Sequence, residues 1–217
     1  MIELISIHIP KTGGTSFYQI LQQVYGESVS ISYKRRDYKK AINEYATIEK
    51  ALSANVKVLH GHLYYKEVKA LHKKHRAGII CWLREPVARV VSNYRFFKAG
   101  LMDPTRNPLN YERNKHRINE SLMTYAAKEE NRNRMSKFLE GIDLKDVFFV
   151  GLLEHFEKDL RRLQQQLHWK ELSIPQLNRS VSGPAANKPT ARELDAIKKL
   201  NEQDLLLYEK ACQLLGK

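Results

Sequence analysis

Short apolar runs alternate with longer amphipathic stretches along the chain. The apolar runs are rich in β-branched and aromatic residues and cover 2–9, 56–59, 78–83 and 146–150. Unbroken runs of this length are typical of strands that are buried on both faces of a sheet. Apolar residues recur with helical spacing over 16–25, 38–52, 66–75, 86–99, 118–139 (interpreted as two helices) and 154–168. The alternation predicts an α/β protein, a three-layer fold whose central parallel sheet is flanked by helices.

Two stretches interrupt this pattern and are predicted to be surface loops. Residues 101–117 and 173–190 contain several prolines and asparagines and lack apolar periodicity. The following stretch, "TARELDAIKKLNEQDLLLYEKACQLL", predicts two helices, with Thr190 and Asn201 as their N-caps. Because 217 residues suffice for one sizeable core, we expect a single domain, residues 1–217.

Composition adds an electrostatic preference. Lysine and arginine number 37 against 24 aspartate and glutamate, a net charge of +13 that favours anionic partners. No apolar run approaches the roughly 20 residues that span a bilayer, and "MIELISIHIP" lacks the basic start of a signal peptide and is interpreted as a strand. Cys81 and Cys212 do not form a disulfide framework, so we expect reduced thiols in a cytoplasmic protein.

The first chemical motif lies between a predicted strand and a predicted helix, in "ISIHIPKTGGTSFYQIL", residues 5–21. At such a junction the free N–H groups of the first helical turn and the helix dipole favour an anion. Glycines let the backbone approach phosphate oxygens, and a lysine and hydroxyls add charge and donors. The residues concerned are Lys11, Thr12, Gly13, Gly14, Thr15 and Ser16. A plain turn capped by Thr15 or Ser16 is the structural alternative, but the combination favours phosphate binding.

The order of residues in this loop differs from that of nucleoside triphosphatases. In a Walker A loop a glycine directly precedes the lysine, whereas Pro10 precedes Lys11 and the glycines follow it. No apolar strand ends in an aspartate that could hold Mg²⁺, because "DVFFV" carries its acid at the start. The pattern favours a metal-free phosphate site over an ATPase.

A second motif, "CWLREPVARVVSNYRFF" (81–97), again runs from strand to helix, with Pro86 in the first helical turn. Arg84 and Ser92 could hold a second phosphate by charge-assisted hydrogen bonds. Taken alone the motif is weak, because Arg84 could equally pair with Glu85 or Asp37.

Together the two motifs are specific. "IPKTGGTS" resembles the 5′-phosphosulfate loop of sulfotransferases, and "LREPVARVVSNY" resembles their 3′-phosphate motif. The similarity is greatest to the branch that contains bacterial sulfotransferases and heparan sulfate 2-O-sulfotransferases. Further stretches resemble that branch in the same order: "LHGHLYY", "VGLLEHFEKDL", "QLNRS" and "DLLLYEKA".

The resemblance implies a P-loop-like fold and the donor 3′-phosphoadenosine-5′-phosphosulfate (PAPS), without a metal. It implies that residues 11–16 hold the 5′-phosphosulfate, with Lys11 near the leaving oxygen, and that Arg84 and Ser92 hold the 3′-phosphate. Residues 178–180 would close over the nucleotide. The chain differs from the Golgi members of the branch because it has no membrane anchor and no cysteine framework, which leaves the acceptor and the compartment open.

Transfer to a hydroxyl needs a base, and histidine has a pKa near working pH. His60 and His62 follow a predicted strand at the edge where the two motifs converge, and in an extended segment they would point to opposite sides. We favour His62 as the base, by its resemblance to the family's catalytic position, and keep His60 as a candidate. Backbone hydrogen bonding near a strand end is the structural alternative for both. His8 is predicted to be a packed core residue.

The sequence thus predicts a sulfotransferase that acts on an acceptor hydroxyl of a carbohydrate or other glycoconjugate. The basic loop 101–117, with Tyr111, could recognise an acidic glycan. The alternatives are a P-loop kinase, disfavoured by the loop order, and a basic nucleic-acid-binding module. No known pattern of interleaved aromatic and basic residues supports that module, so nucleic acid is not the expected partner.

Overall fold

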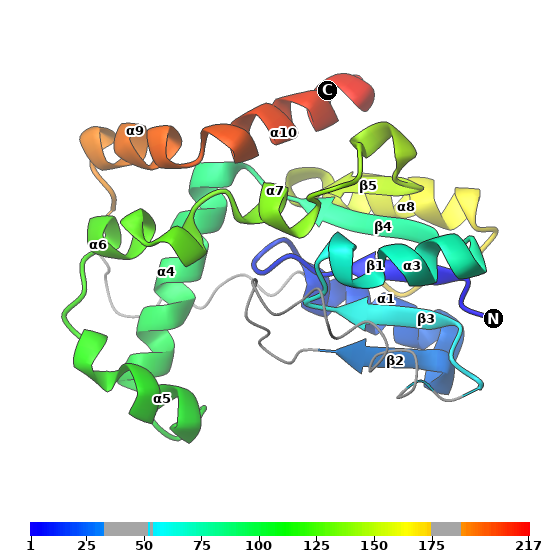
Figure 1. Ribbon diagram of the computed structural model, residues 1–217, viewed down its shortest axis with the longest axis horizontal. Coiled ribbons are helices and arrows are strands. Elements are labelled where there is room, and N and C mark those ends of the chain that lie inside the picture. The colour runs from blue at the N-terminus through cyan, green and yellow to red at the C-terminus, as the bar shows by residue number, and fades with distance from the viewer. Residues whose placement is uncertain (33–51, 53, 175–187) are drawn as a thin grey trace.

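Five parallel strands form the centre of the molecule (Figure 1). The computed structural model describes residues 1–32, 52, 54–174 and 188–217. The strands are β1 (Leu4–Ile7), β2 (Val29–Ser32), β3 (Val58–Gly61), β4 (Gly78–Leu83) and β5 (Phe149–Leu152), in the order β2-β3-β1-β4-β5. All four pairings are parallel. The predicted α/β class and its four strands are therefore confirmed, and β2 is an additional edge strand.

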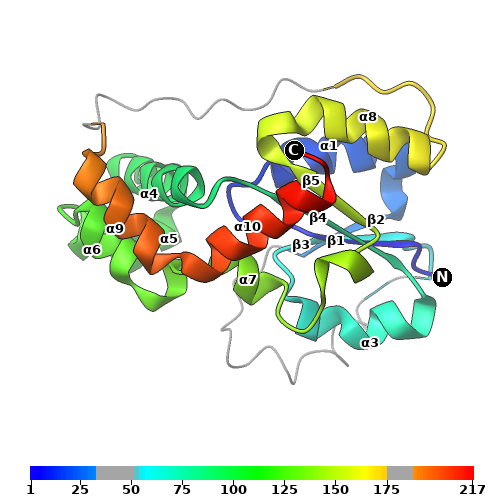
Figure 2. The ribbon, with the colours of Figure 1, turned by 90° about the horizontal axis from the view of Figure 1, so that it is seen from above.

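Helices cover both faces of the sheet (Figure 2). Helices α1 (Gly14–Tyr25) and α8 (Phe156–Gln166) lie on one face, and α3 (Tyr65–His75) lies on the other with α7 (Arg134–Phe138) and α10 (Glu202–Leu214). Side chains of a strand alternate between these layers. In β4, Ile79 and Cys81 pack toward α3, while Ile80 and Trp82 pack toward α1 and α8. Burial on both faces explains why the strands have continuous apolar sequences.

A helical lobe lies beyond the carboxyl ends of the strands (Figure 1). Helix α4 (Pro86–Met102) follows β4 directly, and α5 (Pro108–Asn114), α6 (Leu122–Ala127) and α9 (Ala191–Leu200) lie beside it. Val87 and Val90 of α4 share a buried apolar cluster with Leu122, Ala126 and Ile197. Ligands of open parallel sheets bind beyond the carboxyl ends of the strands. The lobe therefore forms one wall of that region.

Buried polar contacts fix α10 and α9 to the rest of the molecule. Arg89 of α4 and Asp204 of α10 are fully buried and lie 3.8 Å apart, and Asp204 also accepts hydrogen bonds from the Met135 and Ser136 N–H groups. Asn201, between α9 and α10, accepts a hydrogen bond from the Asn133 N–H at 3.0 Å. Removing one partner of such a buried network is strongly destabilising.

Several predicted boundaries need correction. Residues 101–117 are not one loop: α4 continues to Met102, Asn107 caps α5 by accepting the Asn110 N–H, and a 3₁₀ turn covers Lys115–Arg117. Proline at the first position of a helix and asparagine before it favour this start.

Other boundary predictions have mixed outcomes. The stretch 118–139 does contain two helices, α6 and α7, and Thr190 caps α9 as predicted. Asn201 precedes α10 but its side chain does not cap it, because that side chain bonds to Asn133 and Ile197. Most of the predicted helix 38–52 and of the loop 173–190 falls outside the described residues. Within the part of the chain that the structure describes, no helix is long and apolar enough to cross a membrane.

Candidate active site

The loop after β1 leaves the first turn of α1 open to a ligand. Gly13 stands at the N-cap with φ of 92°, and no side chain caps the helix. The first backbone hydrogen bond of the helix runs from the Phe17 N–H to the Gly13 carbonyl at 3.0 Å. The alternative of a turn capped by Thr15 or Ser16 is therefore not observed. The preceding N–H groups are available to an anion at the positive end of the helix dipole.

The conformation of this loop is fixed by close packing. A Cβ atom on Gly14 would lie 1.9 Å from His8 Cδ2, so only glycine fits there. Thr12 is buried and its hydroxyl donates a 2.8 Å hydrogen bond to the Ile9 carbonyl, which stabilises the loop itself. Lys11 adopts φ of 72°, a left-handed conformation that is unusual for a residue other than glycine. Such backbone strain is characteristic of binding loops that are held in one shape.

The two predicted motifs are in direct contact. Arg84, between β4 and α4, donates a hydrogen bond from Nη1 to the Lys11 carbonyl at 3.2 Å. The Glu154 and Glu85 carboxylates oppose the lowering of the Arg84 pKa by burial, but among the described residues neither forms an ion pair with Arg84; Asp37 lies outside the described residues. Glu85 instead accepts hydrogen bonds from the Val87 and Ala88 N–H groups. The first amides of α4 are therefore already bonded, and only side chains of this motif remain for a ligand.

A cavity of about 630 Å³ opens between α4 and α9 beside Arg84. Ser92 lines it and is only 5% exposed, yet among the described residues its hydroxyl has no hydrogen-bond partner. A buried hydroxyl without a partner costs free energy, and a ligand oxygen could supply the missing bond. Arg95, Lys198, Glu85 and other residues of α4 and α9 complete the lining.

Three cations gather at the loop between β1 and α1. Lys11 Nζ lies 4.4 Å from the ring centroid of Phe96 in α4, and the Arg106 guanidinium lies 4.8 Å from the same ring. Burial, Arg84 and Arg106 all lower the pKa of Lys11, since neighbouring positive charges disfavour its protonated form. A bound anion would relieve this repulsion.

The histidines form a cluster next to the loop. His60 is fully buried, and a 2.8 Å hydrogen bond joins its Nδ1 to Ser6 Oγ of β1. Burial and the neighbouring His62 lower the pKa of His60 to about 3, against an opposing contribution from a hydrogen bond with the Gly14 backbone. His62, after the end of β3, is half-buried. The two therefore differ in access to solvent.

His8 connects the two candidate bases. Its ring stacks on His60 with centroids 5.2 Å apart and tilts against His62 at 4.6 Å. Both candidate rings therefore belong to one cluster around His8, and the expectation that they point to opposite sides rested on an extended backbone that this segment lacks. The Leu63 N–H bonds to the Gly61 carbonyl at 2.9 Å, so the backbone turns there rather than staying extended. His8 is buried, in agreement with its predicted place in the core, and burial together with these histidines and Lys11 holds its pKa well below the usual value.

Sequence reasoning missed the parts of the site that come from distant segments. Phe96 was within the second motif but carried no signal beyond helical spacing, and Arg106 was one of several basic residues in a predicted loop. In the sequence, the α9 residues that line the cavity could be recognised only as one face of a predicted helix. Residues 178–180, expected to close over a nucleotide, lie outside the described residues.

Fold and site together define an α/β protein with an uncapped helix start after the first strand of its sheet and a cavity with polar lining between α4 and α9. A model of the sulfotransferase family matches residues 2–211, and the chain belongs to that family. A crystal structure of a sulfotransferase from Alicyclobacillus acidocaldarius is similar to it, with a TM-score of 0.52 and 16% identity over 98% of this chain and 96% of that chain. At this identity the likeness concerns the fold.

A mouse sulfotransferase, SULT7A1 complexed with PAP, is more distant. Its TM-score is 0.43 at 14% identity, over 91% of this chain and 62% of that chain. No curated protein sequence gives a significant match.

Proposed function

We propose that this sulfotransferase uses PAPS as the donor and transfers its sulfuryl group to an acceptor hydroxyl on a carbohydrate or other glycoconjugate. The single observation that carries the proposal is the contact between the two anion sites. The hydrogen bond from Arg84 to the Lys11 carbonyl sets the open end of α1 beside the cavity that contains Ser92. PAPS needs such a pair of sites, because it carries one anionic group on the 5′ carbon of its ribose and another on the 3′ carbon.

The residues present fit both ends of this donor. The uncapped amides of α1 with Lys11 offer donors and charge to the 5′-phosphosulfate, along with the loop residues Thr15 and Ser16. Arg84 and the unpartnered Ser92 hydroxyl offer a guanidinium and a hydroxyl to the 3′-phosphate. A nucleotide without a 3′-phosphate would leave the Ser92 hydroxyl unbonded.

In the proposed reaction the acceptor oxygen attacks sulfur while the bond from sulfur to the leaving phosphate oxygen breaks. Lys11 stabilises the charge that develops on that oxygen. His62 removes the hydroxyl proton. His60 is less suited to this task, because it is fully buried, bonded to Ser6, and its pKa of about 3 makes it a weak base. We assign His60 a structural role.

Ligand-induced thermal stabilisation tests the donor. We expect 3′-phosphoadenosine-5′-phosphate (PAP), the product left after transfer, to raise the melting temperature, and ATP with Mg²⁺ to have little effect. Stabilisation by ATP–Mg²⁺ alone would instead support a kinase, and stabilisation by oligonucleotides alone a nucleic-acid-binding protein. A screen of hydroxyl-bearing acceptors with labelled donor then tests turnover, beginning with acidic glycans because of the +13 net charge.

We also propose that the enzyme acts in the cytoplasm. Cys81 and Cys212 are free in the structure, and burial raises the pKa of the Cys81 thiol to about 12. Thiols kept reduced are typical of that compartment. Fractionation of cells that express the full-length protein tests this assignment.

A further inference from the structure

The cavity between α4 and α9 is built from two matching helix faces. Besides Val87, in the first turn of α4, the lining includes Ala88, Val91, Ser92 and Arg95 of α4 and Ala191, Leu194, Asp195 and Lys198 of α9. Both sets follow the spacing i, i+3, i+4, i+7, which places them on one side of each helix. Each set ends in a basic residue, one turn beyond the polar residue that precedes it.

The position of α9 opposite α4 is fixed rather than incidental. Ile197 of α9 is fully buried in one cluster with Val87 and Val90 of α4. The fully buried Asn201, directly after α9, holds the Asn133 backbone. Lys198 is therefore presented to the cavity by a helix that is anchored on both sides of it.

The charges of the cavity favour an anion. Arg84, Arg95 and Lys198 contribute three positive charges to its lining, against the carboxylates of Glu85 and Asp195. Glu85 is engaged by two N–H groups at the start of α4. Asp195 lies 3.9 Å from Lys198 in an exposed pair, which is weak.

We propose that Arg95 and Lys198 bind the 3′-phosphate of the donor together with Arg84 and Ser92, and that they set the preference for a nucleotide with a phosphate monoester at this position. The inference rests on the proposed function. It makes α9, near the end of the chain, part of the donor site. The unpartnered Ser92 hydroxyl marks the point on the cavity wall where the phosphate binds, and basic side chains from both α4 and α9 line the same cavity.

The test compares the dissociation constants of PAP and adenosine 5′-phosphate, measured by calorimetry on the full-length protein. These ligands differ only in the 3′-phosphate, so the ratio of their constants isolates its contribution. We expect Arg95→Ala and Lys198→Ala each to weaken PAP binding by about fivefold, the upper end for an exposed charge contact. Binding of adenosine 5′-phosphate is expected to stay unchanged. Lys198→Arg should restore PAP affinity, and Asp195→Asn, which frees Lys198, should tighten it.

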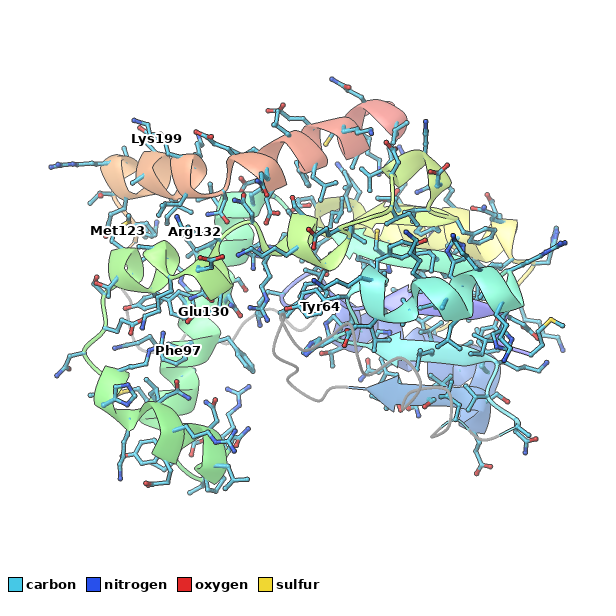
Figure 3. All side chains as sticks on the ribbon, viewed as in Figure 1. Tyr64, Phe97, Met123, Glu130, Arg132 and Lys199 are labelled. Atoms are coloured by element: carbon cyan, nitrogen blue, oxygen red, sulfur yellow. The ribbon has the colours of Figure 1, made fainter. Side chains whose placement is uncertain are left out.

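Lys199→Ala is the matched control, because it removes the same charge from the same helix without touching the cavity. Lys199 does not line the cavity, and Figure 3 shows it on the outer side of α9, away from α6. An equal loss of PAP affinity in the Lys199 and Lys198 variants would show that the loss comes from the change in net charge alone, and would overturn the inference. Wild-type affinity for PAP in both the Arg95 and Lys198 variants would overturn it too, and leave the proposed function intact. Failure of the wild-type protein to bind PAP would instead reject the proposed function.

Discussion

Replacement of Gly14 by alanine should disturb the loop between β1 and α1 through a clash with a single side chain. The added Cβ would lie 1.9 Å from His8 Cδ2 and 2.1 Å from Nε2, whereas carbon atoms in contact stay about 3.5–4 Å apart. The imidazole or the loop must therefore move by about 1.5 Å. Retreat of the ring is blocked, because His8 is packed against His60 and His62.

Overpacking of this kind costs about 1–3 kcal/mol of unfolding free energy. For a chain of this length we expect a melting temperature lower by about 2–4 °C for each kcal/mol, together with weaker PAP binding, because the loop shifts. Gly100→Ala is the control. Its Cβ would meet only Asn110 Nδ2, at 4.0 Å, and alanine in the last turn of α4 should add up to about 0.5–1 kcal/mol of stability. Both variants are compared by calorimetric melting.

A double-mutant cycle identifies the cause. His8→Ala removes the ring that the new methyl group would strike, so Gly14→Ala should cost much less in that background than in the wild type. An equal loss in both backgrounds would refute the explanation. So would a Gly14→Ala protein as stable as the wild type.

Three further predictions concern charge and protonation. Lys11→Ala should lower turnover by about 10²–10³-fold while the melting temperature stays within about 2 °C; unaltered turnover would remove its assigned role. His62→Ala should reduce kcat/KM by about 10²–10⁴-fold, with the acidic limb of the pH profile lost, whereas an intact limb would point to another base. The His60 pKa of about 3 lies below its usual 6.5, so the folded state binds fewer protons, and stability present above pH 6.5 is lost as the pH falls toward 3. At pH 5 the loss of unfolding free energy amounts to about 2 kcal/mol, measured by urea denaturation at pH 7.5 and at pH 5. His60→Gln should reduce this loss, and an unchanged loss would contradict the low pKa of His60.

Local sequence patterns predicted the parts of the fold that depend on local rules. Strands β1, β3, β4 and β5 were predictable because burial on both faces demands continuous apolar runs. Strand β2 was missed, because the edge segment Val29–Ser32 is short and alternates with serine. Helix α5 was missed because its asparagine and proline were interpreted as loop residues, although both also begin helices.

The candidate site likewise has parts that local sequence patterns predict and parts that depend on tertiary packing. The loop after β1 and Arg84 after β4 follow neighbouring parallel strands directly, so the topology of the sheet brings them to one edge. The contact of Phe96 with Lys11 and Arg106 depends on how α4 packs over the loop. The α9 wall of the cavity depends on tertiary contacts between segments about 100 residues apart. No local spacing in the sequence encodes such contacts.

The buried pair of Arg89 and Asp204 constrains the order in which the molecule can be made. During synthesis α4 leaves the ribosome long before Asp204 does. Until Asp204 has been made, the buried ion pair that compensates the Arg89 charge cannot form. The nascent chain can build its sheet early, yet the helix that carries Ser92 acquires this support only after α10 has been made.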